Sequence, residues 1–235
     1  MRVLATLISL IFPIFLGGCV TFLPTIHYRL TIVIDTPQGR RSGSGVTELK
    51  SIIGPKFPIP KIGGLQVTIH GEAVPVRLAD GNYIFVVRKW QRGQEETLRM
   101  LRSSFAQSLT PISISANDDR YDSVVKDQFE ELSRIRGSRP VSPEYYPIVA
   151  HFTDINDPNS IVAADAGRVD QIVKGAKLVS MTIEITDDPV TRRINAILPW
   201  FEKYRNDYFD PYARANPAKE LPSEKRIEKS HFYSQ

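Results

Sequence analysis

The sequence contains one cysteine, Cys19, in 235 residues. Without a second thiol no internal disulfide can form, so an ordinary apolar core must hold the folded body together. A strong excess of one charge is also missing, since 30 Lys and Arg stand against 26 Asp and Glu. Nucleic-acid-binding proteins usually concentrate basic residues far more heavily, so we expect no nucleic-acid partner. The mild positive charge is compatible with anionic headgroups or polysaccharide and does not require them.

Familiar catalytic motifs are absent from the sequence. It has no Gly-x-Ser-x-Gly elbow, and the Gly39–Gly45 segment lacks the lysine and the spacing of a phosphate-binding loop. The two adjacent carboxylate pairs, Asp118-Asp119 and Asp187-Asp188, could in principle act as general acid and base. Neighbouring residues usually point apart, however, and both pairs precede helix signals, so helix capping is the better interpretation.

No metal or cofactor site is predicted either. Asp154 to Asp157 begins like a calcium loop, but Pro158 occupies a ligand position, which favours a turn. The histidines are far apart in sequence, without the spacing of metal ligands. His70 falls on the polar side of a strand, and His151 alternates with apolar neighbours like a hydrogen-bonded core residue. The histidines are His27, His70, His151 and His231.

The N-terminus has no apolar run long enough to span a membrane. After Met1-Arg2, the uncharged stretch from Val3 to Leu16 has about fourteen residues, short of the roughly twenty that a spanning helix needs. Pro13 would also kink such a helix. A basic start, a short apolar core and small residues at the end are typical of a secretory signal, which predicts a signal peptide over residues 1–18.

The residues that close this signal, Leu16-Gly17-Gly18-Cys19, resemble the lipobox of bacterial lipoproteins. The resemblance implies cleavage before Cys19, a diacylglycerol on its thiol and a further acyl chain, such as palmitate, on the new amino terminus. Two or three chains hold a protein on a membrane stably where one does not. Because Val20 rather than aspartate follows, family habits imply the outer membrane, facing the periplasm. The alternatives are a plain cleavable signal or an uncleaved apolar segment.

Hydrophobic periodicity predicts one α+β domain over residues 28–201, with a mainly antiparallel β-sheet and a few short packing helices. Residues 19–27 are expected to be a lipidated terminus and a tether of at most about 26 Å. Residues 202–235 lack periodicity and are rich in charge and proline, which predicts a disordered tail. Strands are expected at 28–34, 46–53, 65–69, 74–78, 83–87, 112–114, 145–152 and 179–185, and helices at 95–105, 122–136, 165–173 and 189–198.

Several local details follow from these patterns. Gly43-Ser44-Gly45 is expected in the loop of a hairpin, and Asp80-Gly81 in a tight turn. The strand 83–87 is apolar on both faces, which predicts a central position in the sheet. In the strand 179–185, Val179 and the alternate residues after it should face the core. Asp188 is expected to cap the helix that begins at Pro189.

Arg88, Lys89, Trp90 and Arg92 combine cations with an indole, a mixture suited to lipid headgroups or sugars, although a solvated strand end is the simpler interpretation. The body resembles uncharacterised bacterial proteins with similar Tyr28–Thr31, Gly43–Gly45 and Ile185–Thr191 segments, a resemblance that implies an α+β fold and no activity. The sequence therefore favours a membrane-anchored, non-catalytic scaffold or binding module for an envelope protein or polymer. The alternatives are an exported hydrolase with a site assembled from distant residues, or a lipid- or glycan-binding module.

Overall fold

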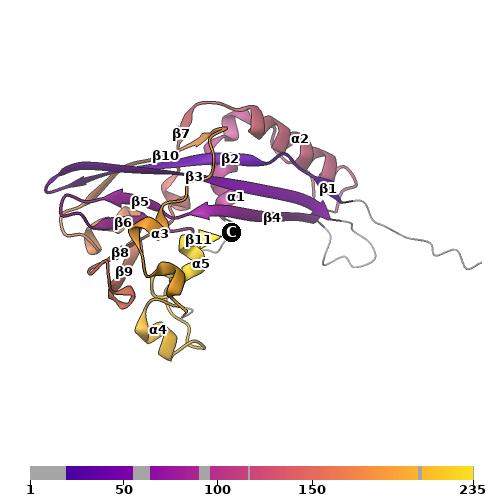
Figure 1. Ribbon diagram of the computed structural model, residues 1–235. Helices are drawn as coiled ribbons and strands as arrows, with labels where there is room; N and C mark the ends of the chain where they lie inside the picture. The colour runs from indigo at the N-terminus through magenta and orange to yellow at the C-terminus, as the bar shows by residue number, and fades with distance from the viewer. Residues whose placement is uncertain (1–19, 55–63, 90–95, 116, 206–207, 235) are drawn as a thin grey trace, which may run out of the picture.

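The computed structural model describes residues 20–54, 64–89, 96–115, 117–205 and 208–234. They form the predicted α+β fold, in which every described strand pair is antiparallel. Figure 1 shows β2 and β3 running along the molecule, with a second sheet stacked beneath one end and β1 at the other. Within the described residues, no helix is long and apolar enough to span a membrane.

The first sheet has the order β11-β4-β3-β2-β10-β7, with β1 paired to β3. In β2, even-numbered side chains from Ile26 to Ile34 are buried while the alternate ones are partly exposed, as the sequence pattern predicts. One face of this sheet is therefore core and the other is open. The strands are β1 (Thr21–Phe22), β2 (Ile26–Thr36), β3 (Gly39–Gly54), β4 (Gly64–Glu72), β7 (Ser138–Pro140), β10 (Lys177–Ile185) and β11 (Tyr233–Ser234).

The second sheet has the order β5-β6-β8-β9. Its strands are β5 (Val74–Arg77), β6 (Tyr83–Val86), β8 (Ile148–Phe152) and β9 (Ile161–Asp165). The central position predicted for strand 83–87 is confirmed, because β6 pairs with both β5 and β8. The predicted turn at Asp80-Gly81 is also found, and Gly81 has a φ of 90° that glycine adopts without strain.

The helices are short and pack on these sheets. The α-helices are α1 (Glu96–Ser104), α2 (Tyr121–Arg134), α3 (Ile194–Ile197), α4 (Pro211–Ala215) and α5 (Lys229–Phe232). Single 3-10 turns are η1 (Ala106–Ser108), η2 (Pro143–Tyr145), η3 (Pro158–Ser160), η4 (Ala166–Gln171), η5 (Phe201–Lys203) and η6 (Ser223–Lys225). Asp165 caps η4 through the N–H of Gly167, close to the predicted helix start. Residues 112–114, expected as a strand, have no regular structure.

Two apolar clusters divide the interior into layers. The first joins the buried face of the first sheet to α1, α2 and one face of the second sheet. The second lies on the other face of the second sheet, where Phe85 and Phe152 meet the C-terminal segment. The second sheet is therefore the middle layer, with apolar side chains packed on both of its faces.

The expected disordered tail is wrong. Phe209, Ile227 and Phe232 are fully buried in the second cluster, and Tyr233 and Ser234 pair with Glu72 and Gly71 at the edge of β4. Burial of several large apolar side chains offsets the entropy of ordering a segment that has few regular hydrogen bonds. The folded body thus extends through residue 234 rather than ending at 201.

The expected tether is also shorter than predicted. Thr21 and Phe22 pair with Ile53 and Ile52 of β3, and the backbone N–H of Leu23 donates to the carbonyl of Ser51 at 3.0 Å. Leu23 is itself buried. The chain therefore joins the sheet at Thr21, two residues after Cys19, and the hairpin of β2 and β3 follows directly.

The prediction that Gly43 and Gly45 lie in a hairpin loop is wrong, because both residues lie inside β3. The turn of the β2–β3 hairpin lies instead at Pro37-Gln38, with Gly39 pairing to Thr36. A Cβ at Gly43 would clash with the carbonyl oxygen of Pro75, so glycine lets β3 pass close over β5. Val179 is likewise corrected: a register shift between Leu178 and Ser180 leaves it 43% exposed rather than facing the core.

A candidate binding face on the open sheet

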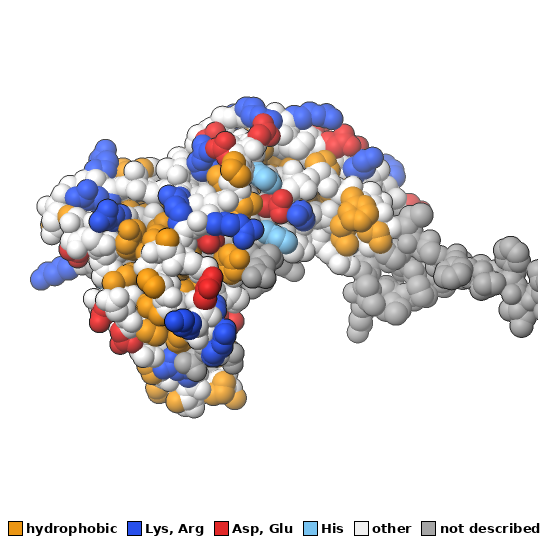
Figure 2. Space-filling view, viewed as in Figure 1, with side chains coloured by type: hydrophobic (Ala, Val, Ile, Leu, Met, Phe, Trp, Pro, Cys, Tyr) orange, Lys and Arg blue, Asp and Glu red, His pale blue; other side chains and the backbone are white. Residues whose placement is uncertain are grey.

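The open face of the first sheet carries a row of ionisable side chains from three neighbouring strands. His27 on β2 lies opposite Glu48 on β3, and Glu48 lies opposite His70 on β4. Because side chains alternate across a strand, the three residues share the solvent side of the sheet at one level. Figure 2 shows histidine, acidic and basic side chains gathered in the middle of this side of the molecule. We call His27, Glu48, Lys50 and His70 the central row.

Glu48 is the hub of the central row. Its Oε2 lies 3.2 Å from His27 Nε2, and its Oε1 lies 2.9 Å from Lys50 Nζ and 4.0 Å from His70 Nδ1. The hydrogen bond from Lys50, followed by that from His27, holds the pKa of the Glu48 carboxyl below its usual range. Glu48 is therefore a carboxylate at neutral pH, with its charge shared among three nitrogen-bearing side chains.

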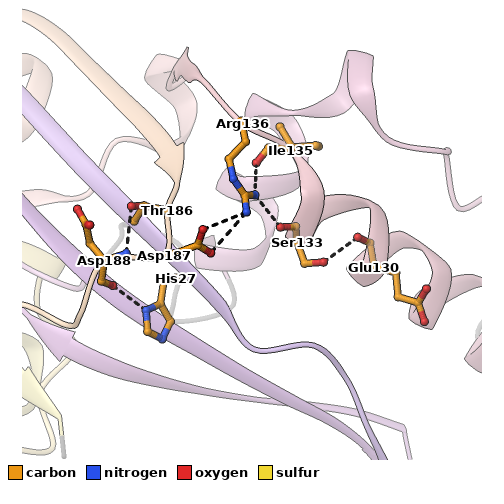
Figure 3. Close-up of polar contacts among 8 residues, drawn as sticks. All are labelled: His27, Glu130, Ser133, Ile135, Arg136, Thr186, Asp187 and Asp188. Carbon is orange, nitrogen blue, oxygen red and sulfur yellow. Dashed lines mark hydrogen bonds and ion pairs between the residues drawn. The ribbon is translucent and has the colours of Figure 1, made fainter.

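The other side of His27 is held by the segment that follows β10. His27 Nδ1 lies 2.8 Å from the carbonyl oxygen of Asp188 (Figure 3). The Asp188 carboxylate pairs with Arg29, which also lies 3.7 Å from Glu184. With both ring nitrogens engaged, the His27 imidazole has a fixed orientation on the face.

The two adjacent carboxylates of this segment do not share a site. Asp187 pairs with Arg136, at 3.2 and 3.4 Å, while Asp188 turns toward the sheet (Figure 3). Arg136 also donates to the carbonyls of Ser133 and Ile135 at the end of α2. The Asp187 side chain thus holds Arg136 at the end of α2, and the Asp188 side chain holds Arg29 on β2. The two side chains diverge, as expected from the sequence. The helix cap predicted for Asp188 is not made by it, since α3 begins at Ile194.

The remaining histidines have structural partners. His151 is buried and its Nδ1 lies 2.9 Å from the carbonyl of Tyr83, which confirms a hydrogen-bonded core residue. His231 Nδ1 accepts the backbone N–H of Glu228 at 2.9 Å inside the α5 turn. Across the described ranges, no group of three His, Cys, Asp or Glu side chains is placed to hold a metal ion.

A small, partly open pocket lies between the two sheets, away from the open face. Tyr28, Thr47, Glu72, Arg88 and Met100 are among its lining residues. Burial raises the pKa of the Tyr28 phenol, which is therefore neutral and a hydrogen-bond donor. The space matches a single water molecule rather than an organic substrate.

Two members of the predicted headgroup or glycan contact, Arg88 and Lys89, lie against the C-terminal segment and are partly exposed. Arg88 donates to the carbonyl of Ser230 at 2.5 Å and Lys89 to the carbonyl of Arg226 at 2.5 Å. Burial lowers the pKa of both side chains. Both cations therefore fasten the C-terminal segment to the end of β6. Trp90 and Arg92 lie outside the described residues.

The lipobox residues Leu16, Gly17, Gly18 and Cys19 also lie outside the described residues, and Val20 is the first residue placed. The central row was missed from the sequence, although two signals were available. His27 and His70 each fall on the polar side of an alternating strand, and Glu48 lies between two core residues of β3. These residues are aligned by the registers in which β3 pairs with β2 and with β4, and those registers were not predicted.

Comparisons with known proteins give no external guide to this face. No protein-family model matches the chain, and neither a curated protein nor a solved structure matches it. Function must therefore be inferred from the residues and geometry of the chain itself.

Proposed function

We propose that this protein is a bacterial envelope lipoprotein, anchored through acylated Cys19, that acts as a non-catalytic binding module for another envelope protein. The outer membrane, with the body in the periplasm, is the proposed location. The observation that carries the proposal is the open face of the first sheet, where β2, β3 and β4 present an ordered row of charged and imidazole side chains. The chain joins this sheet at Thr21, two residues after the proposed anchor. Rigid, partly exposed polar groups on a sheet suit recognition, because little side-chain entropy is lost on binding.

The composition of the central row favours a protein partner over a charged polymer. In the central row the Glu48 carboxylate lies beside the Lys50 ammonium group and two imidazoles, and Arg29 beside them is paired with acidic groups. A uniformly anionic polysaccharide would meet Glu48, Glu184 and Asp188 as repulsive groups. A protein surface can instead present complementary charges of both signs. Mixed charge therefore supports specificity for one partner rather than general adhesion.

The hydrolase alternative has less support in the described part of the chain. An acyl-transfer or hydrolytic site needs a nucleophile or a held water beside a base, in a place that excludes solvent. His70 does meet a carboxylate, but it does so on an open sheet face. The glycan-binding alternative loses Arg88 and Lys89, which are engaged by backbone carbonyls.

The anchor is tested by labelling cells with radioactive palmitate. We expect the wild-type chain to take up label and to float with membranes, and Cys19→Ala to do neither. Label in the Cys19→Ala chain, or flotation without label, would contradict the lipoprotein assignment.

The binding face is tested by placing a photo-crosslinking amino acid at Thr68, an exposed position on β4 beside the central row. We expect one discrete adduct in intact cells, which disappears when Glu48→Lys reverses the charge of the hub. Tyr212, half exposed on α4, is the matched position for the control crosslinker. The same adduct from both positions, or an adduct that survives Glu48→Lys, would contradict recognition by this face.

A further inference from the structure

Two apolar side chains are exposed where the chain joins the sheet. Phe22 is 79% exposed and Val20 is 43% exposed. Exposure of so much of an aromatic ring to water is unfavourable in free energy. Beside a membrane anchor, the lipid bilayer is an apolar environment that the ring can reach. The two residues lie one and three positions after Cys19, so at about 3.3 Å per residue their Cα atoms lie within roughly 10 Å of it.

The backbone prevents Phe22 from folding inward. Phe22 is paired with Ile52 and Thr21 with Ile53, while the next residue, Leu23, is buried and hydrogen-bonded to Ser51. Since successive side chains on a strand point to opposite faces, burial of Leu23 directs Phe22 to the other side. The exposure of Phe22 is therefore fixed by strand pairing rather than by an unconstrained terminus.

We propose that Val20 and Phe22 insert into the interfacial region of the lipid bilayer and fix the orientation of the sheet on it. This inference rests on the proposed lipid anchor at Cys19. Apolar and aromatic side chains at a membrane interface are buried about 5–10 Å deep, at the boundary of headgroups and acyl chains. Acyl chains on Cys19 would hold the neighbouring residues at this boundary. The anchored end of the first sheet thus faces the lipid.

This orientation places the central row in reach of a partner. Glu48 lies four residues beyond Ile52 along β3, a distance of about 13 Å at the rise of an antiparallel strand. The headgroup layer on one side of a bilayer is only about 5–8 Å thick. The central row therefore clears the headgroups, while the tip of the β2–β3 hairpin at Gln38 lies farthest from the membrane.

The test uses the full lipidated chain in vesicles of phosphatidylethanolamine and phosphatidylglycerol. Thioether formation consumes the thiol of Cys19, the single cysteine of the sequence, so F22C and Q38C each provide one reactive thiol for an environment-sensitive dye. Both positions are exposed, and unlabelled unfolding curves check that each variant folds as the wild type does. We expect the dye at position 22 to shift to the blue and to be quenched by brominated lipid several-fold more than the dye at position 38.

Each other outcome identifies what failed. If the protein floats with vesicles but positions 22 and 38 are equally accessible to aqueous iodide, the membrane contact is wrong and the anchor stands. If position 22 is shielded from iodide but is not quenched by brominated lipid, a second copy of the chain covers it, and the inference is overturned. If the protein does not float, the anchor and this inference fail together.

Discussion

The carboxylate of Glu72 accepts a hydrogen bond from the backbone N–H of Ile194 at 3.0 Å, across 122 residues of sequence. The N–H of Arg193 donates to the same oxygen. Glu72 ends β4 and is 6% exposed, so this single side chain satisfies two donors at the start of α3 and joins the first sheet to the C-terminal layer. A helix start left without such acceptors would bury unpaired N–H groups.

Removing this cap should destabilise the whole fold. We expect Glu72→Ala to lower the free energy of unfolding by about 1–3 kcal/mol, because the buried N–H of Ile194 and the partly buried N–H of Arg193 lose their acceptor. Glu72→Gln keeps a carbonyl oxygen and should cost less. Asp188→Ala, which removes an exposed ion pair with Arg29, should cost no more than about 1 kcal/mol. Urea unfolding of the three variants measures the difference, and an equal loss in all three would contradict the assignment.

The cap also shows where sequence reasoning succeeded and failed. Asp188 followed by Pro189 matches the local pattern of a helix start, but the acceptor is supplied by a residue 122 positions away, which no local pattern contains. The strand over 28–34 was predicted correctly because alternation is local and one face is buried. The C-terminal aromatics were missed because they are buried by clustering in space, with no period to reveal it.

The same limit applies to the binding face. The solvent-facing side of each strand could be predicted one residue at a time, so His70 was correctly placed on a polar side. The approach of His27, Glu48 and His70 depends on the registers of β2, β3 and β4. Register follows from turn geometry and from packing of the opposite face, and neither was available from composition.

Buried His231 should make stability depend on pH. Its Nδ1 accepts the N–H of Glu228, so the ring must be neutral, and burial, with Lys89 and Arg88 nearby, lowers its pKa to about 3. Between pH 6.5 and about pH 3, His231 is protonated in the unfolded chain and neutral in the folded chain. Stability from this residue is therefore complete above about pH 6.5 and decreases as the pH falls, by about 2 kcal/mol between pH 7 and 5.

The measurement compares wild type with His231→Asn by urea unfolding at pH 7 and pH 5. Asparagine can accept the Glu228 N–H but cannot be protonated, so the variant should lose less stability on acidification than the wild type. Other titrating groups affect both chains equally and cancel in the difference. Identical pH dependence of the two chains would show that His231 is not the responsible group.

Gly43 should tolerate no side chain. The carbonyl of Pro75 on β5 occupies the space that a Cβ at this position would need, and Val76 packs beside it. We expect Gly43→Val to separate the two sheets locally and to cost at least about 1–3 kcal/mol, the usual effect of overpacking. Ser42→Ala, one residue away and on an exposed position, should change the unfolding midpoint little. Thermal unfolding distinguishes the two.

The C-terminal segment should be part of the cooperative fold. The Phe209 ring lies 4.7 Å from that of Tyr204, 5.7 Å from Phe152 and 5.4 Å from Phe232, measured between centroids. We expect Phe209→Ala to cost about 3–5 kcal/mol, as large-to-small changes in a packed aromatic core do. Tyr212→Ala, half exposed on the neighbouring helix, should stay within about 0.5 kcal/mol of wild type.

Truncation at Glu202 is the stronger form of the same prediction. It uncovers the outer face of the second sheet, including Phe85 and Phe152, and removes the carbonyls that Arg88 and Lys89 bind. The shortened chain should bind hydrophobic dyes and aggregate, because a large apolar face and two partly buried basic side chains would lose their partners together. If the truncated chain unfolded with the same midpoint and cooperativity as wild type, the C-terminal segment would be an independent appendage, as its sequence alone predicted.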